Sequence, residues 1–92
     1  MKTEVRPYIN LLGFKGKDRV TGFEGVITSI SFDLYGCVQV ILNPGVGVDG
    51  KLKDANWFDV VRVEITSKDP VMRAPDFEWV HGAETKPVPM RG

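Results

Sequence analysis

The stretch that decides the fold is residues 25–42, GVITSISFDLYGCVQVIL. Apolar and polar residues alternate over 25–32, apart from Ile27, and every second residue of 37–42 is valine or leucine. This period of two is typical of β-strands. The four residues between the two runs, DLYG, begin with aspartate and end with glycine, which favours a tight turn. The stretch therefore predicts an antiparallel hairpin.

Further strands are predicted on both sides of this hairpin. Asn43-Pro44 ends the second strand, because proline has no amide hydrogen to donate to a sheet. Alternation resumes at 57–58 and over 60–66, where we expect an inner face formed by Val61, Val63 and Ile65, and Arg62 and Glu64 facing water. Upstream, residues 19–21 are short enough to be a first strand, closed by a turn at 22–25.

Residues 12–66 thus hold four to five short strands with glycine about every ten residues, a spacing typical of small antiparallel barrels. No run of ten or more residues has the helical period without glycine or proline. We predict an all-β fold, a small SH3-like barrel over residues 12–66. An extended N-terminal arm of residues 1–11 and a proline-rich C-terminal arm of residues 67–92 flank it.

The C-terminal arm combines proline with large apolar side chains. It contains four of the six prolines, which exclude a helix or a central strand. It also carries Phe77, Trp79 and Val80, and a tail that is free in solvent rarely holds so many large apolar side chains. Two arrangements stay open: the arm wraps back over the barrel, with 76–80 as an added edge strand, or it docks on another subunit. In the second arrangement, these three residues are candidate partner contacts.

Residues 43–51, NPGVGVDGK, match the G-x-G-x-x-G spacing of dinucleotide-binding loops. That loop needs a helix opening within the glycines, and the next predicted strand follows too soon to leave room for one. The stretch instead predicts a hairpin tip with Asp49-Gly50 in the turn. Bare glycine amides could still bind phosphate, and Lys51 and Lys53 are the candidate contacts there.

The charges are balanced over the chain and uneven along it. Lysine and arginine total 12, and so do aspartate and glutamate, so there is no overall field to attract nucleic acid or an anionic membrane. Residues 1–19 hold five basic and two acidic residues, a local excess of three positive charges. Lys15 and Lys17 in this region are candidate contacts for an acidic partner or for phosphate.

The residue types of common catalytic and metal sites are scarce. Cys37 and His81 are the only cysteine and histidine, too few for a closed zinc site, and Cys37 is predicted to be a small packing residue. Nothing fixes the separation of Asp33, Asp59 and Glu64, and Asp59 is expected to accept a main-chain hydrogen bond. We predict no catalytic residues, no cofactor and no metal, and therefore a protein that is not an enzyme.

The N-terminal residues lack the pattern of a signal peptide, and no apolar run approaches the ~20 residues that span a bilayer. The single cysteine excludes an intramolecular disulfide, which fits a reducing compartment. We expect an intracellular protein that is neither secreted nor bound in a membrane.

Four segments resemble a family of small, mostly uncharacterised proteins of tailed phages and prophages. They are KDRVTGFEGVIT at 17–28, LYGCVQ at 34–39, DGK at 49–51 and WFD at 57–59. The similarity covers residues 12–65, and Gly16 departs from it where a branched apolar residue is expected. The resemblance implies a phage origin, in a virion or in the cytoplasm of an infected host, and carries over no catalytic residue.

Three functions follow as expectations. The first is a non-enzymatic structural or assembly module whose arms dock on other virion proteins or on copies of itself. The second is a counter-defence protein that blocks a host protein or binds a small nucleotide signal through residues 45–50, Lys15, Lys17 and Arg19. The third is a small nucleic-acid-binding barrel, which a neutral chain favours least.

Overall fold

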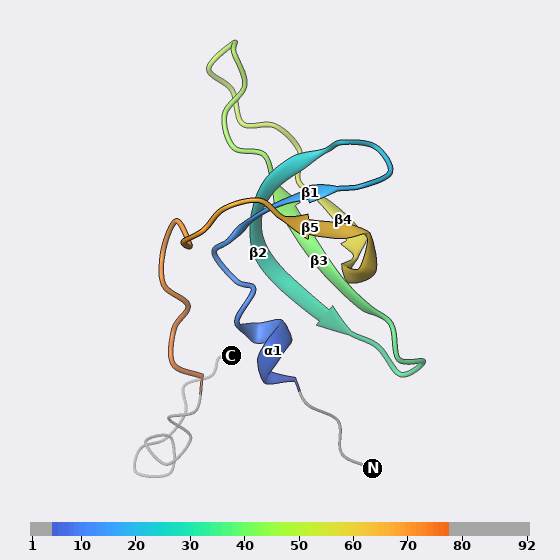
Figure 1. Cartoon of the computed structure of the whole chain (residues 1–92). Coiled ribbons are helices and arrows are strands. Elements are labelled where there is room, and N and C mark those ends of the chain that lie inside the picture. The colour runs from blue at the N-terminus through green and yellow to red at the C-terminus, as the bar shows by residue number, and fades with distance from the viewer. Residues whose placement is uncertain (1–4, 78–92) are drawn as a thin grey trace, which may run out of the picture.

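A computed structural model describes residues 5–77 of the chain (Figure 1). Its elements, in chain order, are a short helix α1 (Arg6–Ile9), the strands β1 (Lys15–Asp18), β2 (Glu24–Phe32), β3 (Val38–Asn43) and β4 (Asn56–Asp59), a 3-10 turn η1 (Val60–Arg62), and the strand β5 (Val63–Ile65). The prediction of a small all-β domain is therefore confirmed.

The five strands form one antiparallel sheet in the order β4-β3-β2-β1-β5. The strands β4 and β5 are its two edges, and they do not hydrogen-bond to each other, so the sheet is not closed into a barrel by hydrogen bonds. In a flat sheet these edges would lie about 19 Å apart, whereas η1 joins Asp59 to Val63 over at most about 15 Å of chain. The sheet must therefore curl to bring its two edges together.

The hairpin of β2 and β3 is confirmed, and so is the turn between them. The Asp33 side chain accepts hydrogen bonds from the amides of Tyr35 and Cys37, each at 2.9 Å. The amide of Gly36 donates to the main-chain oxygen of Asp33. This arrangement explains why aspartate stands at the start of the turn.

Ile27 interrupts the alternation because β2 contains a β-bulge. Ile27 pairs with Leu42 while Ser29 pairs with Ile41, so the residue between them, Thr28, has no partner in β3. The bulge shifts the register by one residue. Ile27, the residue that interrupts the alternation of the sequence, therefore belongs to the core together with Val40 and Leu42.

The first strand lies earlier than predicted. Residues 15–18 form β1, and residues 19–21 belong to the turn that follows it. Gly25, predicted to be in this turn, lies within β2. A Cβ atom at this position would come within 2.6 Å of the main chain of Asn43, so Gly25 permits the close approach of β3.

The predicted continuous strand over 60–66 is broken by η1. Val61 is 82% exposed instead of facing inward, because the 3-10 turn rotates it away from the sheet. The prediction that Arg62 faces water holds only in part, since its side chain is 38% exposed while its guanidinium binds a buried carboxylate. In β5, Val63 is half-buried, whereas Ile65 is exposed, so the prediction that Ile65 faces inward was also wrong.

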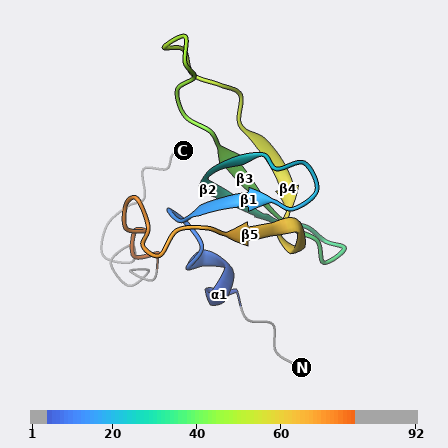
Figure 2. The same cartoon turned by 45° about the horizontal axis from the view of Figure 1, so that its top comes forward.

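The described part of each arm is attached to the sheet. In the N-terminal arm, residues 6–9 form α1 and are not extended as predicted, and the Tyr8 ring of α1 lies edge-on to the Phe32 ring of β2, with centroids 5.9 Å apart. In the C-terminal arm, Ser67 Oγ accepts a hydrogen bond from the amide of Lys15, and the amide of Val71 donates to the carbonyl of Gly13 (Figure 2). Asp76 and Phe77 are not in a strand, and the rest of the predicted edge strand, 78–80, lies outside the described residues.

Candidate interaction surface

The glycine-rich stretch forms the end of a hairpin that projects from the sheet between β3 and β4 (Figure 1). We call residues 44–55 the hairpin tip. An isolated bridge joins Val46 to Leu52, and the amide of Gly47 donates to the carbonyl of Lys51 at 2.7 Å. The amide of Gly50 donates to the carbonyl of Gly47, so the turn runs over 47–50 with Val48 and Asp49 at its centre, and Gly50 ends it with a φ of 81°. The hairpin prediction for this stretch is confirmed.

The hairpin tip presents apolar side chains to solvent. Val46 is 61% exposed, Leu52 is 80% exposed, and Val48 lies fully in solvent between them. The bridge and the turn bonds hold these side chains on a preformed loop, which reduces the entropy lost when a partner binds. The hairpin tip is therefore suited to contact another protein.

The glycine amides of the hairpin tip are already hydrogen-bonded. Gly45 donates to Asn43 Oδ1 at 3.0 Å, Gly47 to Lys51, and Gly50 to the carbonyl of Gly47 at 3.0 Å. A phosphate-binding loop needs such amides to point at the ligand. Lys51 and Lys53 are exposed, so their ammonium groups are accessible to an anion, whereas these three glycine amides are already engaged.

Lys15 and Lys17 lie on β1, in the body of the sheet. Lys17 stands opposite Glu24 of β2 on one side and Glu64 of β5 on the other. Directly opposed residues on neighbouring strands share a face, so two carboxylates offset its charge. Lys15 is exposed and lines a cavity of about 190 Å³ whose lining includes neither lysine of the hairpin tip. Of the four candidate lysines, Lys17, Lys51 and Lys53 do not line this cavity.

A buried ion pair lies where the β1–β2 turn meets η1. Arg62 Nε and Nη2 donate to the two carboxylate oxygens of Asp18, each at 2.7 Å, and Asp18 is 0% exposed. The same carboxylate accepts hydrogen bonds from the amide and the hydroxyl of Thr21. The guanidinium carbon lies 5.4 Å from the centre of the Phe58 ring. This cluster joins β1 to the segment that connects the two sheet edges.

Sequence reasoning missed this cluster. Asp18 and Thr21 are three residues apart, a spacing that suits a local turn in which the carboxylate accepts a hydrogen bond from the main chain. The sequence therefore contained a signal for the bond between Asp18 and Thr21. Arg62 is 44 residues further along the chain, and only the fold brings it to Asp18. Its role is structural, because the carboxylate is fully enclosed.

The ion pair predicts an acid-sensitive fold. The hydrogen bond from Arg62, together with those from Thr21, holds the pKa of Asp18 well below its usual range. A lowered native pKa stabilises the fold above the unfolded value of about 4, and this contribution is lost as the pH falls below it. We expect the urea midpoint of the wild type to fall between pH 6 and pH 3, and that of Asp18→Asn to fall less.

The matched control is Asp54→Asn, because Asp54 is exposed on the hairpin tip. This variant should keep the acid sensitivity of the wild type. An Asp18→Asn chain that loses as much stability in acid as the wild type would show that other carboxylates carry the effect.

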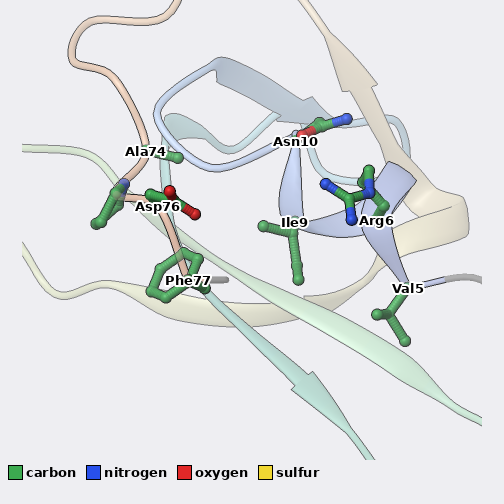
Figure 3. A pocket seen from close by; sticks show the side chains of 8 residues that line it. Val5, Arg6, Ile9, Asn10, Ala74, Asp76 and Phe77 are labelled. Atoms are coloured by element: carbon green, nitrogen blue, oxygen red, sulfur yellow. The ribbon is translucent and has the colours of Figure 1, made fainter. Parts of the chain in front are cut away.

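Among the predicted contacts of the C-terminal arm, Phe77 is 52% exposed, and Trp79 and Val80 lie outside the described residues. Phe77 borders a pocket of about 210 Å³ between α1 and residues 74–77. Figure 3 shows Phe77 and Asp76 on one side of this pocket and Ile9 and Arg6 on the other. The described end of the arm thus adjoins a hollow of the surface.

Cys37 is exposed, so its predicted packing role is wrong. The negative charge of Asp33 raises the pKa of its thiol, which disfavours the nucleophilic thiolate. Within residues 5–77, no group of three or more potential metal ligands comes together, and no helix is long and apolar enough to cross a membrane. His81 lies outside the described part of the chain.

Comparisons with known proteins assign no family to this surface or to the fold that carries it. The phage resemblance therefore stays a prediction from the sequence. No protein-family model, no curated protein and no solved structure matches the chain.

Proposed function

We propose that the protein is a non-enzymatic assembly module of a tailed phage, built on a small SH3-like barrel, that docks on other virion proteins or on copies of itself. The topology supports the barrel part of the proposal. Five antiparallel strands are arranged with a 3-10 turn linking the two edge strands, and that link draws the sheet around on itself.

One observation carries the proposal: the balance between buried and exposed apolar side chains in the described part of the chain. There, only Ile27, Val40 and Leu42 are fully buried apolar residues, whereas fourteen large hydrophobic residues are exposed. Small domains with so little core gain stability by burying apolar surface against partners. A subunit of an assembly gains this stability, because its exposed apolar residues are buried in the interfaces with its neighbours.

The exposed apolar residues gather at separate places on an elongated molecule. Val46, Val48 and Leu52 lie on the hairpin tip, while Leu34 and Tyr35 lie on the turn between β2 and β3, at the other end of β3 (Figure 1). The longest dimension of the chain is 46 Å. Two contact regions at different places let one subunit touch two neighbours, as assembly into a ring or tube requires.

The two alternative functions have weaker support. A nucleotide binder would need free amides in the hairpin tip, and those of Gly45, Gly47 and Gly50 are engaged. A nucleic-acid binder would need a basic face, and Lys17 on β1 is flanked by Glu24 and Glu64. Neither alternative is favoured by a specific feature of the described residues.

The test is the oligomeric state of the purified full chain, measured by sedimentation over a range of concentrations. We expect the wild type to self-associate and the double variant Val48→Lys/Leu52→Lys to sediment as a monomer, because each lysine places a charge where the interface would exclude water. Both side chains are exposed, so the variant should fold normally, as circular dichroism can verify.

The control is Val61→Lys, the same kind of substitution at an exposed valine on η1, which should associate like the wild type. The second arm of the test is the protein composition of purified phage particles. A wild type that is monomeric at every concentration and is missing from the particles would contradict the proposal.

A further inference from the structure

The curled sheet has two free edges, one on β4 and one on β5. Figure 2 shows β5 on the outer side of β1. Natural proteins protect such edges with proline, lysine or a bulge. The strands β4 (NWFD) and β5 (VEI) contain neither proline nor lysine, and each pairs with its neighbour in one unbroken register. Each edge can therefore accept a strand from another chain.

The main-chain groups on the open side of β5 follow from its bonds to β1. The amide of Thr66, directly after the strand, donates to the carbonyl of Lys15 in β1. Successive residues of a strand direct their main-chain groups to opposite sides, so Val63 and Ile65 point away from β1. The amide of Val63 donates to the carbonyl of Val60. The carbonyl of Val63 and both main-chain groups of Ile65 have no partner among residues 5–77.

The main-chain groups on the open side of β4 are identified in the same way. The carbonyl of Cys37, directly before β3, accepts a hydrogen bond from the β2 side of the hairpin. Val40, three positions further on, therefore directs its main-chain groups toward β4, where Phe58 stands opposite it. Trp57 and Asp59, on either side of Phe58, direct their amides and carbonyls to the open side of β4. These two residues have the same spacing as the two that β5 presents.

The exposed side chains at these positions are complementary as well. An antiparallel pairing that sets Asp59 of one copy opposite Val63 of another also sets Trp57 opposite Ile65. Trp57 is 47% exposed and Ile65 is 38% exposed, and directly opposed residues share one face of a sheet. An aromatic side chain opposite a β-branched one is a stabilising pair. One register therefore satisfies the main-chain groups and buries both apolar side chains.

The hairpin tip extends the surface along β4. Strands of four and three residues provide few hydrogen bonds, so the two edges alone would associate weakly. The hairpin tip ends at residue 55 and β4 begins at Asn56, so the two are continuous (Figure 1). The exposed Leu52 lies on the side of the tip that leads into β4. A chain that pairs along β4 therefore comes close to the tip, whose apolar side chains add buried area.

We propose that β4 of one copy of the chain pairs antiparallel with β5 of a second copy, so that one sheet continues into the next. This inference rests on the proposed function and names the surfaces through which copies associate. The described part of the C-terminal arm leaves β5 on the side of β1, because the amide of Lys15 donates to Ser67 and the amide of Val71 donates to Gly13. Each copy has one edge of each kind, so the contact is head-to-tail and can repeat into a ring.

The test is a complementation experiment, read out by sedimentation of the full chain. Trp57→Lys places a charge on the β4 edge and Ile65→Lys places one on the β5 edge, so each variant alone should be a monomer. Each variant keeps one intact edge. An equimolar mixture should therefore form a heterodimer, in which β4 of the Ile65→Lys chain pairs with β5 of the Trp57→Lys chain.

Both side chains are exposed, so both variants should fold, as circular dichroism can verify. If Ile65→Lys does not fold, Ile65→Pro takes its place, because it removes an amide that has no partner among the described residues. The control is Val20→Lys, at an exposed valine of the turn between β1 and β2, which should associate like the wild type.

Edge variants that associate as strongly as the wild type would overturn this inference and leave the proposed function standing. An Ile65→Lys chain that dimerises alone would also overturn it, because that result indicates pairing of β4 with β4. So would a mixture that stays monomeric. A wild type that is monomeric at every concentration would overturn the inference too, and the composition of the phage particles would then decide the proposed function separately.

Discussion

An Arg62→Met chain is expected to lose about 3 to 5 kcal/mol of its folding stability at neutral pH. The substitution keeps a long side chain against Phe58 and removes the guanidinium that binds both carboxylate oxygens of Asp18. The carboxylate is 0% exposed and would keep only the hydrogen bonds from Thr21. Leaving one charge of a buried pair without its partner is among the most destabilising single changes. The measurement is the urea unfolding midpoint, followed by circular dichroism at pH 7.

The matched control is Arg19→Met. Arg19 is the residue after Asp18, its side chain is exposed, and its amide donates to the carbonyl of Arg62, a bond that the substitution leaves in place. Its midpoint should stay close to that of the wild type. The double variant Asp18→Leu/Arg62→Met should recover stability relative to Arg62→Met, because it removes the unpaired charge as well. An Arg62→Met chain as stable as the wild type would contradict a structural role for the pair.

This cluster has a large effect because of its place in the topology. Asp18 ends β1, next to the centre of the sheet, and Arg62 ends η1, the link between the two sheet edges. The edges share no hydrogen bonds, so the curl of the sheet depends on contacts made by this link. The ion pair is such a contact. The Phe23–Phe58 ring contact, with ring centroids 5.3 Å apart, adds a contact between β4 and the turn that joins β1 to β2.

The features that sequence analysis predicted correctly are local ones. The turn at 33–36 and the tip at Asp49-Gly50 are each stabilised by residues within a few positions, so composition alone indicates them. Val40 and Leu42 lie two positions apart in β3, so the alternating pattern of this strand likewise indicates its buried face. In each case the physical cause lies in the same short stretch as the signal.

The features that it missed depend on distant parts of the chain. Ile27 joins the core because a bulge against β3 shifts the register, and the alternation of β2 alone does not reveal a bulge. Arg62 resembles a solvent-facing residue of a strand until η1 turns it onto Asp18. For the candidate site, sequence located the hairpin tip, and the engaged amides of its glycines became visible only with the fold.

Leu42→Ala is the second variant for which we expect a large effect. Leu42 is 0% exposed and pairs with Ile27 across the sheet, and only Ile27 and Val40 are comparably buried apolar residues in the described part of the chain. Truncating a buried leucine costs about 2 to 5 kcal/mol, which includes the cavity it leaves. A small domain has a total stability of about 5 to 10 kcal/mol. The urea midpoint should therefore fall by about a fifth or more, as equilibrium unfolding would measure.

The same substitution at the exposed residue Leu34 is the control, because it makes the same chemical change without removing buried packing. Leu34 is 90% exposed on the turn between β2 and β3, so Leu34→Ala removes the same atoms without opening a cavity, and its midpoint should barely change. If Leu42→Ala were no more destabilising than Leu34→Ala, the fold would not depend on its three-residue core. If the difference is as large as expected, the isolated chain has little stability to spare. Burial of its exposed apolar residues against a partner would then raise its stability in proportion to the strength of binding.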